Sequence, residues 1–361
     1  MQNNQAIPFN KENFKQILSK EFAWVIIVSI PGALIAEYFN IPLAWFLGPM
    51  LVTSIVSLSG FKLKMPRLIL SIVLIFLGLY IGNYIDKNLF SQIDQWILTS
   101  LVMLGYIILS VLIVSKYLQK FSGYGKKTSI FSAAPGALGP LLILAETEKS
   151  DLSQVATSHL IRLIIIITVF PFLVQSLYDF EGTQEKIEVI TDQNFWHLLI
   201  LIAFSIFLIL IFDKFRLPAA LLSGTLVASG LLQIAEIATY KLPSNVIDYC
   251  LLILGSSVGC RFADKTFNEI AKNALHSFVA TFLLVILGVI AAVVASLVIE
   301  KNFFTLLLSY CPGGIYEVAV IAIFFDLDPE FVSFHHIIRL LMILFLVPII
   351  LKIMHKKKPT N

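Results

Sequence analysis

The sequence predicts an all-α polytopic membrane protein with two homologous, inverted repeats of five spans, each with a re-entrant segment broken by Pro-Gly. Three observations support this prediction: an apolar composition, a series of long apolar runs, and residue matches between the two halves at a fixed offset. Of 361 residues, 58% are hydrophobic and 14% are charged, and the mean hydropathy is +0.89. Because soluble domains carry roughly 25% charged residues, the composition argues against a soluble enzyme, a nucleic-acid binder and a disordered regulator.

Ten apolar runs are the expected spans, since a membrane helix needs about 20 mostly apolar residues. Polar residues precede the first run and Pro31-Gly32 interrupts it, so we expect a retained span and not a cleaved signal peptide. The expected spans are residues 22–39, 43–60, 66–85, 96–114, 155–177, 196–212, 219–232, 246–262, 278–299 and 331–350.

Two further apolar stretches, residues 128–145 and 303–325, are interrupted near the middle. The first contains Pro135-Gly136 and the second contains Pro312-Gly313-Gly314. Proline and glycine break a helix, and a broken helix at membrane depth must line a cavity or be buried in protein. We expect both stretches to be re-entrant. The alternative, in which both cross the membrane and the chain has twelve spans, remains open.

The two halves match at a nearly constant offset. Pro42 and Gly48 reappear as Pro218 and Gly224, which is an offset of 176. At an offset of 177 the matching pairs are Pro66 and Pro243, Gly78 and Gly255, Gly82 and Gly259, Pro135 and Pro312, Gly136 and Gly313, Asp151 and Asp328, His159 and His336, Arg162 and Arg339, and Pro171 and Pro348. So many matches at one offset predict an internal duplication.

The distribution of basic residues favours the ten-span topology. With the N-terminus inside, ten spans place 20 of the 26 Lys and Arg residues in cytoplasmic segments, whereas twelve spans divide them 17 to 7. We therefore expect an inner-membrane protein with both termini in the cytoplasm. Its parts are a cytoplasmic arm (1–21), a first repeat (22–177), a linker (178–195), a second repeat (196–354) and a basic tail (355–361).

The two Pro-Gly segments are the predicted functional site. A broken helix exposes unpaired N–H and C=O groups and the end of a helix dipole. Inverted repeats whose broken elements meet near the midplane are the architecture of secondary transporters. Pro135, Gly136, Pro312, Gly313 and Gly314 are therefore candidate binding residues. The alternative is that Pro-Gly merely kinks packed helices.

Ionisable residues inside the last span of each repeat are the second candidate set. His159 and Arg162 are three residues apart and so share a helix face, and His336 and Arg339 repeat the pattern. Two interpretations remain open. These side chains contact an anion or substrate or relay a proton, or they form a structural pair that donates to carbonyls of the neighbouring broken segment or snorkels toward the headgroups.

Glu317 is the one carboxylate inside either broken segment, and the matching residue of the first copy is Pro140. Desolvation would favour proton uptake by this carboxylate, so it is a candidate coupling group for a proton or sodium ion. A structural ion pair with Arg162 or Arg339 is the alternative.

Enzyme motifs are absent from the sequence, and we predict neither a catalytic residue nor a cofactor nor a metal site. Cys250, Cys260 and Cys311 show no metal-binding spacing. The Gly-x-x-x-Gly spacings at Gly78 and Gly255 predict close helix packing.

The expected partners are the bilayer and a small solute or ion, without nucleic acid, and a homo-oligomer is compatible with the sequence. The predicted function is a secondary transporter or exporter of a small polar or anionic solute, ion- or proton-coupled. The alternatives are a membrane sensor or regulator acting through a partner and, last, a membrane enzyme.

The second broken segment and the following helix carry a family resemblance. Residues 312–317, read as Pro-Gly-Gly-Ile-Tyr-Glu, together with Asp328-Pro329 and residues 335–339, read as His-His-Ile-Ile-Arg, resemble the bacterial membrane AbrB-like family. The first copy looks like that family's first repeat but departs from the motif at Ala137 and Pro140. The resemblance covers about residues 22–354. The resemblance implies functional labels that range from regulation of gene expression to ammonia oxidation. Ammonia oxidation by copper would need clustered metal ligands, which this sequence lacks.

Overall fold

The computed structural model describes residues 11–85, 93–136, 138–178, 195–215, 217, 219–238 and 243–356, and this part of the chain is helical without strands. Most of the predicted linker, both chain ends, and Ala137 lie outside the described residues. The helices are α1 (Lys11–Ile17), α2 (Lys20–Tyr38), α3 (Ala44–Leu58), α4 (Arg67–Gly82), α5 (Ile93–Phe121), α6 (Lys126–Ala133), α7 (Leu138–Thr147), α8 (Leu152–Leu177), α9 (Phe195–Lys214), α10 (Ala220–Ile234), α11 (Ser244–Cys260), α12 (Phe267–Ser296), α13 (Phe303–Tyr310), α14 (Ile315–Phe324) and α15 (Pro329–Lys356).

Six of these helices are long and apolar enough to cross a membrane, as a multi-pass membrane protein requires. They are α2, α5, α8, α9, α12 and α15. The other four expected spans are the shorter helices α3, α4, α10 and α11, which have 15 to 17 residues. At 1.5 Å per residue these four are about 22–26 Å long, somewhat less than the hydrocarbon core of a bilayer.

The helix bounds repeat along the chain as the duplication predicts. Both ends of α6 and α7 match the ends of α13 and α14 at the offset that relates the two Pro-Gly pairs. Both ends of α3 match those of α10 at the offset that relates Pro42 to Pro218. Unusual backbone conformations repeat as well. Leu43 and Ala219 precede α3 and α10, and both are left-handed, with φ of 53° and 52°. The match therefore extends from sequence to local geometry.

The chain divides into two compact units that draw on both halves of the sequence. Unit 1 contains residues 1–91, 171–267 and 320–330. Unit 2 contains residues 92–170, 268–319 and 331–361. Unit 1 thus holds the first three spans of each half, and unit 2 holds both Pro-Gly pairs and nearly all of the remaining spans. A compact unit is therefore assembled from matching pieces of the two predicted repeats.

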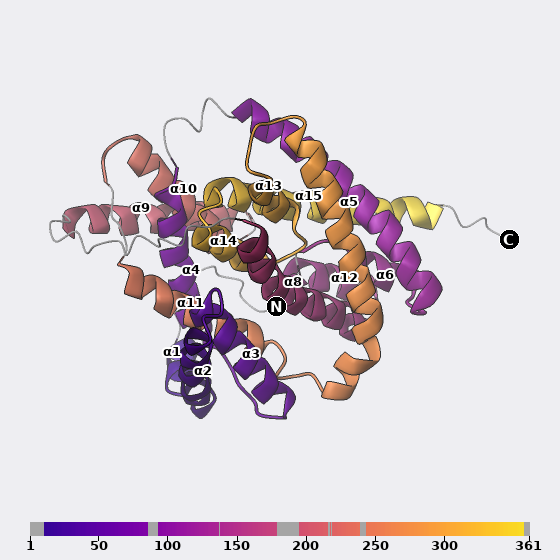
Figure 1. Cartoon of the computed structure of the whole chain (residues 1–361), viewed down its shortest axis with the longest axis horizontal. Coiled ribbons are helices and arrows are strands. Elements are labelled where there is room, and N and C mark those ends of the chain that lie inside the picture. Colours follow the sequence, from indigo (N-terminus) through magenta and orange to yellow (C-terminus); the bar gives the residue numbers. More distant parts are fainter. Residues whose placement is uncertain are drawn as a thin grey trace. The chain divides into compact units, whose positions relative to one another are not determined.

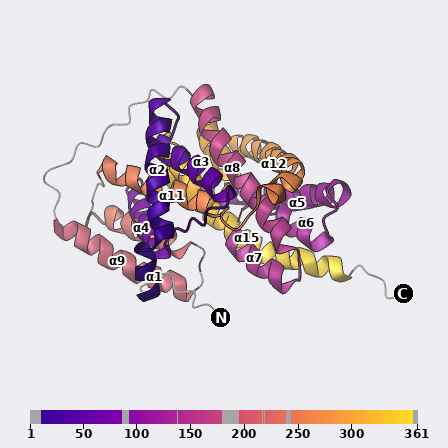
Figure 2. The same ribbon diagram turned by 90° about the horizontal axis from the view of Figure 1, so that it is seen from below.

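In unit 1, helices from the two halves pack side by side. Helix α3 packs against α2 and α11, and α4 packs against α10 (Figure 1, Figure 2). Glycines allow this close approach. A Cβ added at Gly255 of α11 would collide with the carbonyl oxygen of Phe46 on α3, and one added at Gly82 of α4 would lie 2.8 Å from the carbonyl oxygen of Leu226 on α10. The predicted close packing at the Gly-x-x-x-Gly spacings is confirmed.

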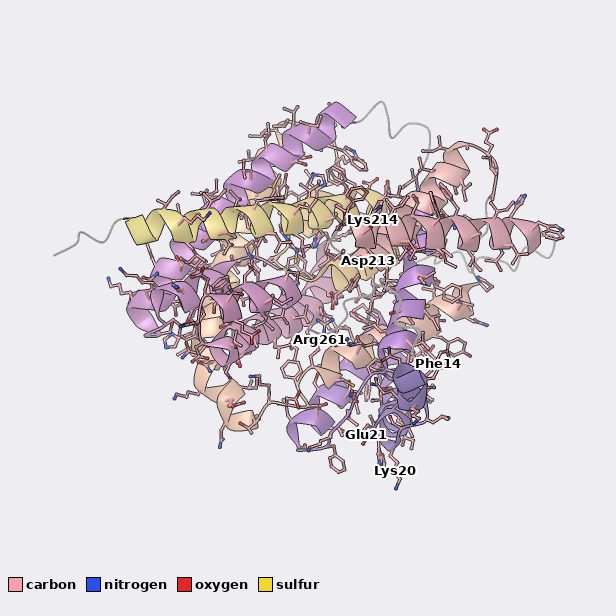
Figure 3. All side chains as sticks on the ribbon, turned by 180° about the vertical axis from the view of Figure 1, so that it is seen from behind. Phe14, Lys20, Glu21, Asp213, Lys214 and Arg261 are labelled. Carbon is pink, nitrogen blue, oxygen red and sulfur yellow. The ribbon has the colours of Figure 1, made fainter. Side chains whose placement is uncertain are left out.

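Charged side chains of unit 1 occur at the ends of its apolar helices. Figure 3 labels Lys20 and Glu21, which begin α2, Asp213 and Lys214 in the last turn of α9, and Arg261, which caps α11. Charge is thus kept away from the middle of these helices, as a lipid environment favours.

In unit 2, α5 and α12 lie side by side (Figure 1). Val114 and Leu118 of α5, Ala133 of α6, and Ala280 and Leu284 of α12 form one buried apolar cluster. This cluster joins the first half of the sequence to the second, and through Ala133 it includes the end of α6, just before the first Pro-Gly pair.

Candidate functional site

The first Pro-Gly segment turns the chain back on itself. Helix α6 ends at Ala133 and α7 begins at Leu138, and we call residues 134–136 the first break. Ala134 has an extended backbone, with φ of −61° and ψ of 128°, because a residue that precedes proline is disfavoured in a helical conformation. Gly136 then adopts a φ of 102°, a left-handed value that favours glycine.

Hydrogen bonds at the base of this segment show that α6 and α7 form a helical hairpin. Near the start of α6, the Lys127 ammonium donates to the Glu148 carboxylate over 2.6 Å, just beyond the end of α7. The Asp151 backbone N–H donates to the Thr128 hydroxyl over 3.2 Å. The chain therefore enters along α6 and returns along α7. In the loop before α6, Tyr124 donates to the Asn273 side chain, and burial raises the pKa of its hydroxyl.

Helix α8 holds the first break through His159 and Arg162. The Arg162 Nη1 donates to the Ala134 carbonyl oxygen over 2.7 Å, and Nη2 donates to the Ser132 carbonyl oxygen. His159 Nε2 lies 3.0 Å from the Phe131 carbonyl oxygen and donates to it, since a carbonyl can only accept. Both side chains are buried. Together they satisfy carbonyls that lose their helical partners where α6 ends.

The second Pro-Gly segment is held in the same way by α15. We call residues 311–314, between α13 and α14, the second break. The Arg339 Nη1 donates to the Cys311 carbonyl oxygen, and Nη2 donates to that of Gly313 over 2.6 Å. His336 Nε2 donates to the Leu308 carbonyl oxygen over 2.9 Å, while its Nδ1 accepts from Arg339 over 3.0 Å. These bonds fix the neutral tautomer of His336.

Inside unit 2, each break packs against a helix of the other half of the chain. A Cβ added at Gly136 of the first break would lie 2.8 Å from Arg339 Nη2 and 3.3 Å from its Nε. A Cβ added at Gly313 of the second break would lie 3.2 Å from the Ile166 side chain of α8. Each break therefore touches the helix that holds the other one. Arg339 reaches both breaks, whereas the hydrogen bonds of Arg162 go to Ala134 in the first break and to Ser132 near the end of α6.

Two guanidinium groups bring positive charge into the interior of unit 2. Arg162 and Arg339 are each 2% exposed, and among the described residues neither forms an ion pair with a carboxylate. Within the same part of the chain, the buried Nε of each has no hydrogen-bond partner. The two guanidiniums also interact electrostatically with each other. Buried charge without a counter-ion is costly, so the breaks form an electropositive site suited to an anion.

Residues from α5 and α13 line this region, and sequence reasoning did not find them. Tyr106 is buried and interacts electrostatically with both Arg162 and Arg339. Its ring packs 6.3 Å from that of Tyr310, whose hydroxyl donates to the Thr99 carbonyl oxygen over 2.8 Å. In a single sequence, nothing marks these two tyrosines of apolar runs as residues of a functional site. Only the fold brings Tyr106 to the breaks.

Glu317 lies at the start of α14, with 1% of its surface exposed. Its carboxylate covers Gly314, because a Cβ added at that glycine would collide with a Glu317 carboxylate oxygen. Glu317 thus folds back over the N-terminus of its own helix, where a negative charge is favoured by the helix dipole. The matching position in α7 is Pro140, so the first break has no such carboxylate.

The structure brings together the predicted site residues within unit 2. These residues are Pro135, Gly136, His159, Arg162, Pro312, Gly313, Gly314, Glu317, His336 and Arg339. The two arginines make the carbonyl hydrogen bonds expected of a structural pair, and Arg339 in addition lies against the opposite break. Their role in solute binding stays a prediction. The described residues contain no cluster of three His, Cys, Asp or Glu side chains suited to a metal ion.

Comparison with known families decides the classification. The family model described as "Transition state regulatory protein AbrB" matches residues 2–88 and 45–355. The chain belongs to the membrane AbrB family. The resemblance seen in the sequence is thus confirmed. The overlapping matches are consistent with an internally repeated AbrB chain.

Two AbrB-family relatives align with nearly the whole chain. "Uncharacterized protein YhjN" of Bacillus subtilis (strain 168) is 23% identical over 359 residues, covering 92% of this chain and 92% of the relative. "Putative regulator AbrB" of Escherichia coli (strain K12) is 23% identical over 331 residues, covering 89% and 92%. No solved structure matches the chain.

Proposed function

We propose that this AbrB-family chain is a secondary transporter of a small anionic solute, which binds where the two helix breaks meet. The single observation that carries the proposal is the pair of buried guanidiniums, Arg162 and Arg339, without a carboxylate partner among the described residues. A structural role alone would be met by the Nη donors, which bind the carbonyls of the breaks. Each Nε–H remains as a donor for a ligand.

The energetics favour binding of an anion at the breaks. A charged side chain at the centre of a bilayer costs at least about 2.5–3.5 kcal/mol, and intramembrane arginines usually mark ion or substrate pathways. Each charge-assisted hydrogen bond contributes roughly 1.5–3 kcal/mol. The bonds to the backbone therefore offset much of the cost of burying Arg162 and Arg339, but they leave the net positive charge in place. An anion neutralises that charge.

The proposed topology has five spans in each repeat, a re-entrant hairpin formed by α6 and α7 or by α13 and α14, and inverted repeats. An odd number of spans turns the second repeat upside down relative to the first. The hydrogen bonds between the two ends of the first hairpin support the re-entrant form. The segregation of 20 of 26 basic residues supports cytoplasmic termini in a bacterial inner membrane.

Glu317 is the proposed coupling group. It is the buried carboxylate of the described chain and lies at the second break, close to the site of the proposed solute. Protonation of Glu317 would change the net charge of the buried groups by one unit. Solute binding and proton binding would then depend on each other, which is the requirement for coupled transport.

Flux measurements on purified protein in proteoliposomes test the transporter proposal. We expect saturable uptake of at least one small anion from a panel of carboxylates, phosphate and halides, faster with an inward proton gradient than without one. Protein-free liposomes and a proton uncoupler serve as controls. Absence of gradient-dependent flux over the whole panel would contradict the proposal.

A regulatory role is the second candidate, and one specific observation favours it. The Escherichia coli relative carries the name "Putative regulator AbrB". Such a protein would act through a partner, because no long polar segment in this chain offers a soluble output domain. The two candidate functions can be distinguished in a deletion strain that carries a variant without transport activity. A regulator would still restore the expression pattern lost on gene deletion, and a transporter would not.

A further inference from the structure

The hydroxyl of Tyr106 is a buried group that lacks a hydrogen-bond partner in the described chain. Tyr106 of α5 is 3% exposed, and its Oη has no partner among the described residues. Ser110, one turn further along α5, lies near this hydroxyl without forming a hydrogen bond, and its own Oγ has no partner either. Because a buried hydroxyl without a partner destabilises a fold, the Tyr106 hydroxyl is suited to a bound group that supplies an acceptor.

The neighbouring Tyr310 shows the contrasting case of a structural hydroxyl. The two rings lie edge to face, with centroids 6.3 Å apart, and the Tyr310 hydroxyl donates to the Thr99 carbonyl oxygen over 2.8 Å. A Cβ added at Gly288 of α12 would lie 3.1 Å from the Tyr310 carbonyl oxygen and 3.9 Å from Tyr106 Cε2. Packing against α12 and Tyr310 therefore holds the Tyr106 ring beside the second break, and no hydrogen bond anchors its hydroxyl.

Tyr106 lies near the two guanidiniums on which the proposed function depends. Of the groups that interact electrostatically with Arg162, Tyr106 does so most strongly, and the same is true for Arg339. Hydrogen bonds from the Nη atoms fix both guanidiniums against backbone carbonyls, whereas each Nε–H has no partner among the described residues. Helices α5, α8 and α15 thus each contribute one buried donor without a described partner to the same unit.

The charge balance of the buried groups favours a monovalent ligand. The fully buried Arg, Lys, Asp and Glu side chains of the described chain are Arg162, Arg339 and Glu317. With Glu317 ionised, these groups leave one positive charge, which a monoanion neutralises and a dianion would exceed in a region of low dielectric. A carboxylate has about four acceptor sites, and O–H donors form short, strong hydrogen bonds to it. Chloride is a weaker acceptor and gains less from a hydroxyl.

Resting on the proposed function, we infer that Tyr106 is a third ligand of the transported solute, and that its hydroxyl donates to a small monocarboxylate that also accepts from the Nε of Arg162 and of Arg339. The hydroxyl then selects carboxylates over halides. At the matching position of α12 the residue is Leu283. The duplicated chain therefore supplies this hydroxyl once, and the solute site is asymmetric.

The test is equilibrium binding of radiolabelled acetate to the purified full-length chain in detergent, with unlabelled acetate and chloride as competitors. Tyr106→Phe removes only the hydroxyl. We expect acetate affinity to fall at least about fivefold, while chloride affinity changes by less than about threefold. The midpoint of unfolding in SDS without acetate should not fall, because the lost hydroxyl has no described partner. Tyr310→Phe is the matched control and should keep acetate affinity within about threefold of the wild type.

The outcomes separate this inference from the proposed function. A smaller loss of acetate affinity in Tyr106→Phe, a parallel loss of chloride affinity, or an equal loss in Tyr310→Phe overturns the inference and leaves anion transport standing. A wild type that transports another anion without binding acetate does the same. Absence of binding and of flux for every anion overturns the proposed function itself. If Tyr106→Phe fails to fold, Tyr106→Met replaces it, since methionine fills irregular space without a hydroxyl, and the same loss is expected.

Discussion

The substitution Gly136→Ala tests the geometry of the first break most simply. Gly136 has a φ of 102°, which an L-residue with a Cβ adopts only under strain. An added Cβ would also lie 2.8 Å from Arg339 Nη2, so the guanidinium or the backbone must shift. Such backbone strain costs roughly 1–3 kcal/mol. Weakening one charge-assisted hydrogen bond, that of Arg339 to Gly313, costs about 1.5–3 kcal/mol more.

We therefore expect Gly136→Ala to lower the free energy of unfolding by about 2.5–6 kcal/mol. The assay is an SDS titration of the purified protein in mixed micelles, followed by tryptophan fluorescence. Gly105→Ala is the matched control, because a Cβ added at Gly105 in α5 meets nothing within 4 Å. That control should be neutral or more stable by up to about 1 kcal/mol. Equal unfolding free energies for the two variants would refute the account of the first break.

Four further predictions concern packing, surface charge, topology and coupling. Gly255→Val should cost about 1–3 kcal/mol of unfolding free energy, because its side chain would collide with the Phe46 carbonyl of α3; a wild-type unfolding curve would contradict the packing. Lys127→Ala should cost at most about 1 kcal/mol, since its ion pair with Glu148 is partly solvated; a larger loss would show that this pair holds the hairpin. A reporter fused after Phe180, which lies outside the described residues, should read periplasmic, whereas twelve spans require a cytoplasmic signal. Glu317→Gln should insert normally and abolish the response of flux to a proton gradient, and an unchanged response would reject Glu317 as the coupling group.

The local features of the breaks could be predicted from the sequence because they depend on short-range rules. Proline forces the preceding Ala134 and Cys311 out of the helix, so both breaks occur where the Pro-Gly pairs stand. A spacing of three residues puts His159 and Arg162 on one helix face. His159 then reaches a carbonyl in the last turn of α6, and Arg162 reaches one in the break that follows.

The relation between the breaks could not be predicted, because it depends on contacts between residues far apart in the sequence. Nothing in a single sequence places Gly136 against Arg339, which lies in the other half of the chain, or brings Tyr106 of an apolar run to both arginines. The sequence also leaves open whether Arg162 and Arg339 hold backbone carbonyls or contact a solute. The structure shows the carbonyl bonds, and the Nε of each arginine has no hydrogen-bond partner among the described residues.

The division into two units also escaped sequence analysis. The duplication indicates repeats at residues 22–177 and 196–354, but each compact unit draws helices from both. The cause lies in packing between the halves. Glycines on α4 and α11 pack against α10 and α3 of the other half. The Gly-x-x-x-Gly spacing predicts close packing at these glycines but does not identify the partner helix. The bounds of the helices themselves were predictable, since both ends of α3 and α10 lie within two residues of the expected spans 43–60 and 219–232.

Solute flux in proteoliposomes that contain the wild type or Arg339→Gln tests the central claim most directly. The claim is that the buried positive charge at the helix breaks binds the transported anion. Acetate and the wider anion panel should enter wild-type proteoliposomes in a saturable manner. Arg339→Gln, verified as folded by gel filtration, should reduce that flux at least about tenfold. Full anion flux in the folded Arg339→Gln protein would contradict the claim.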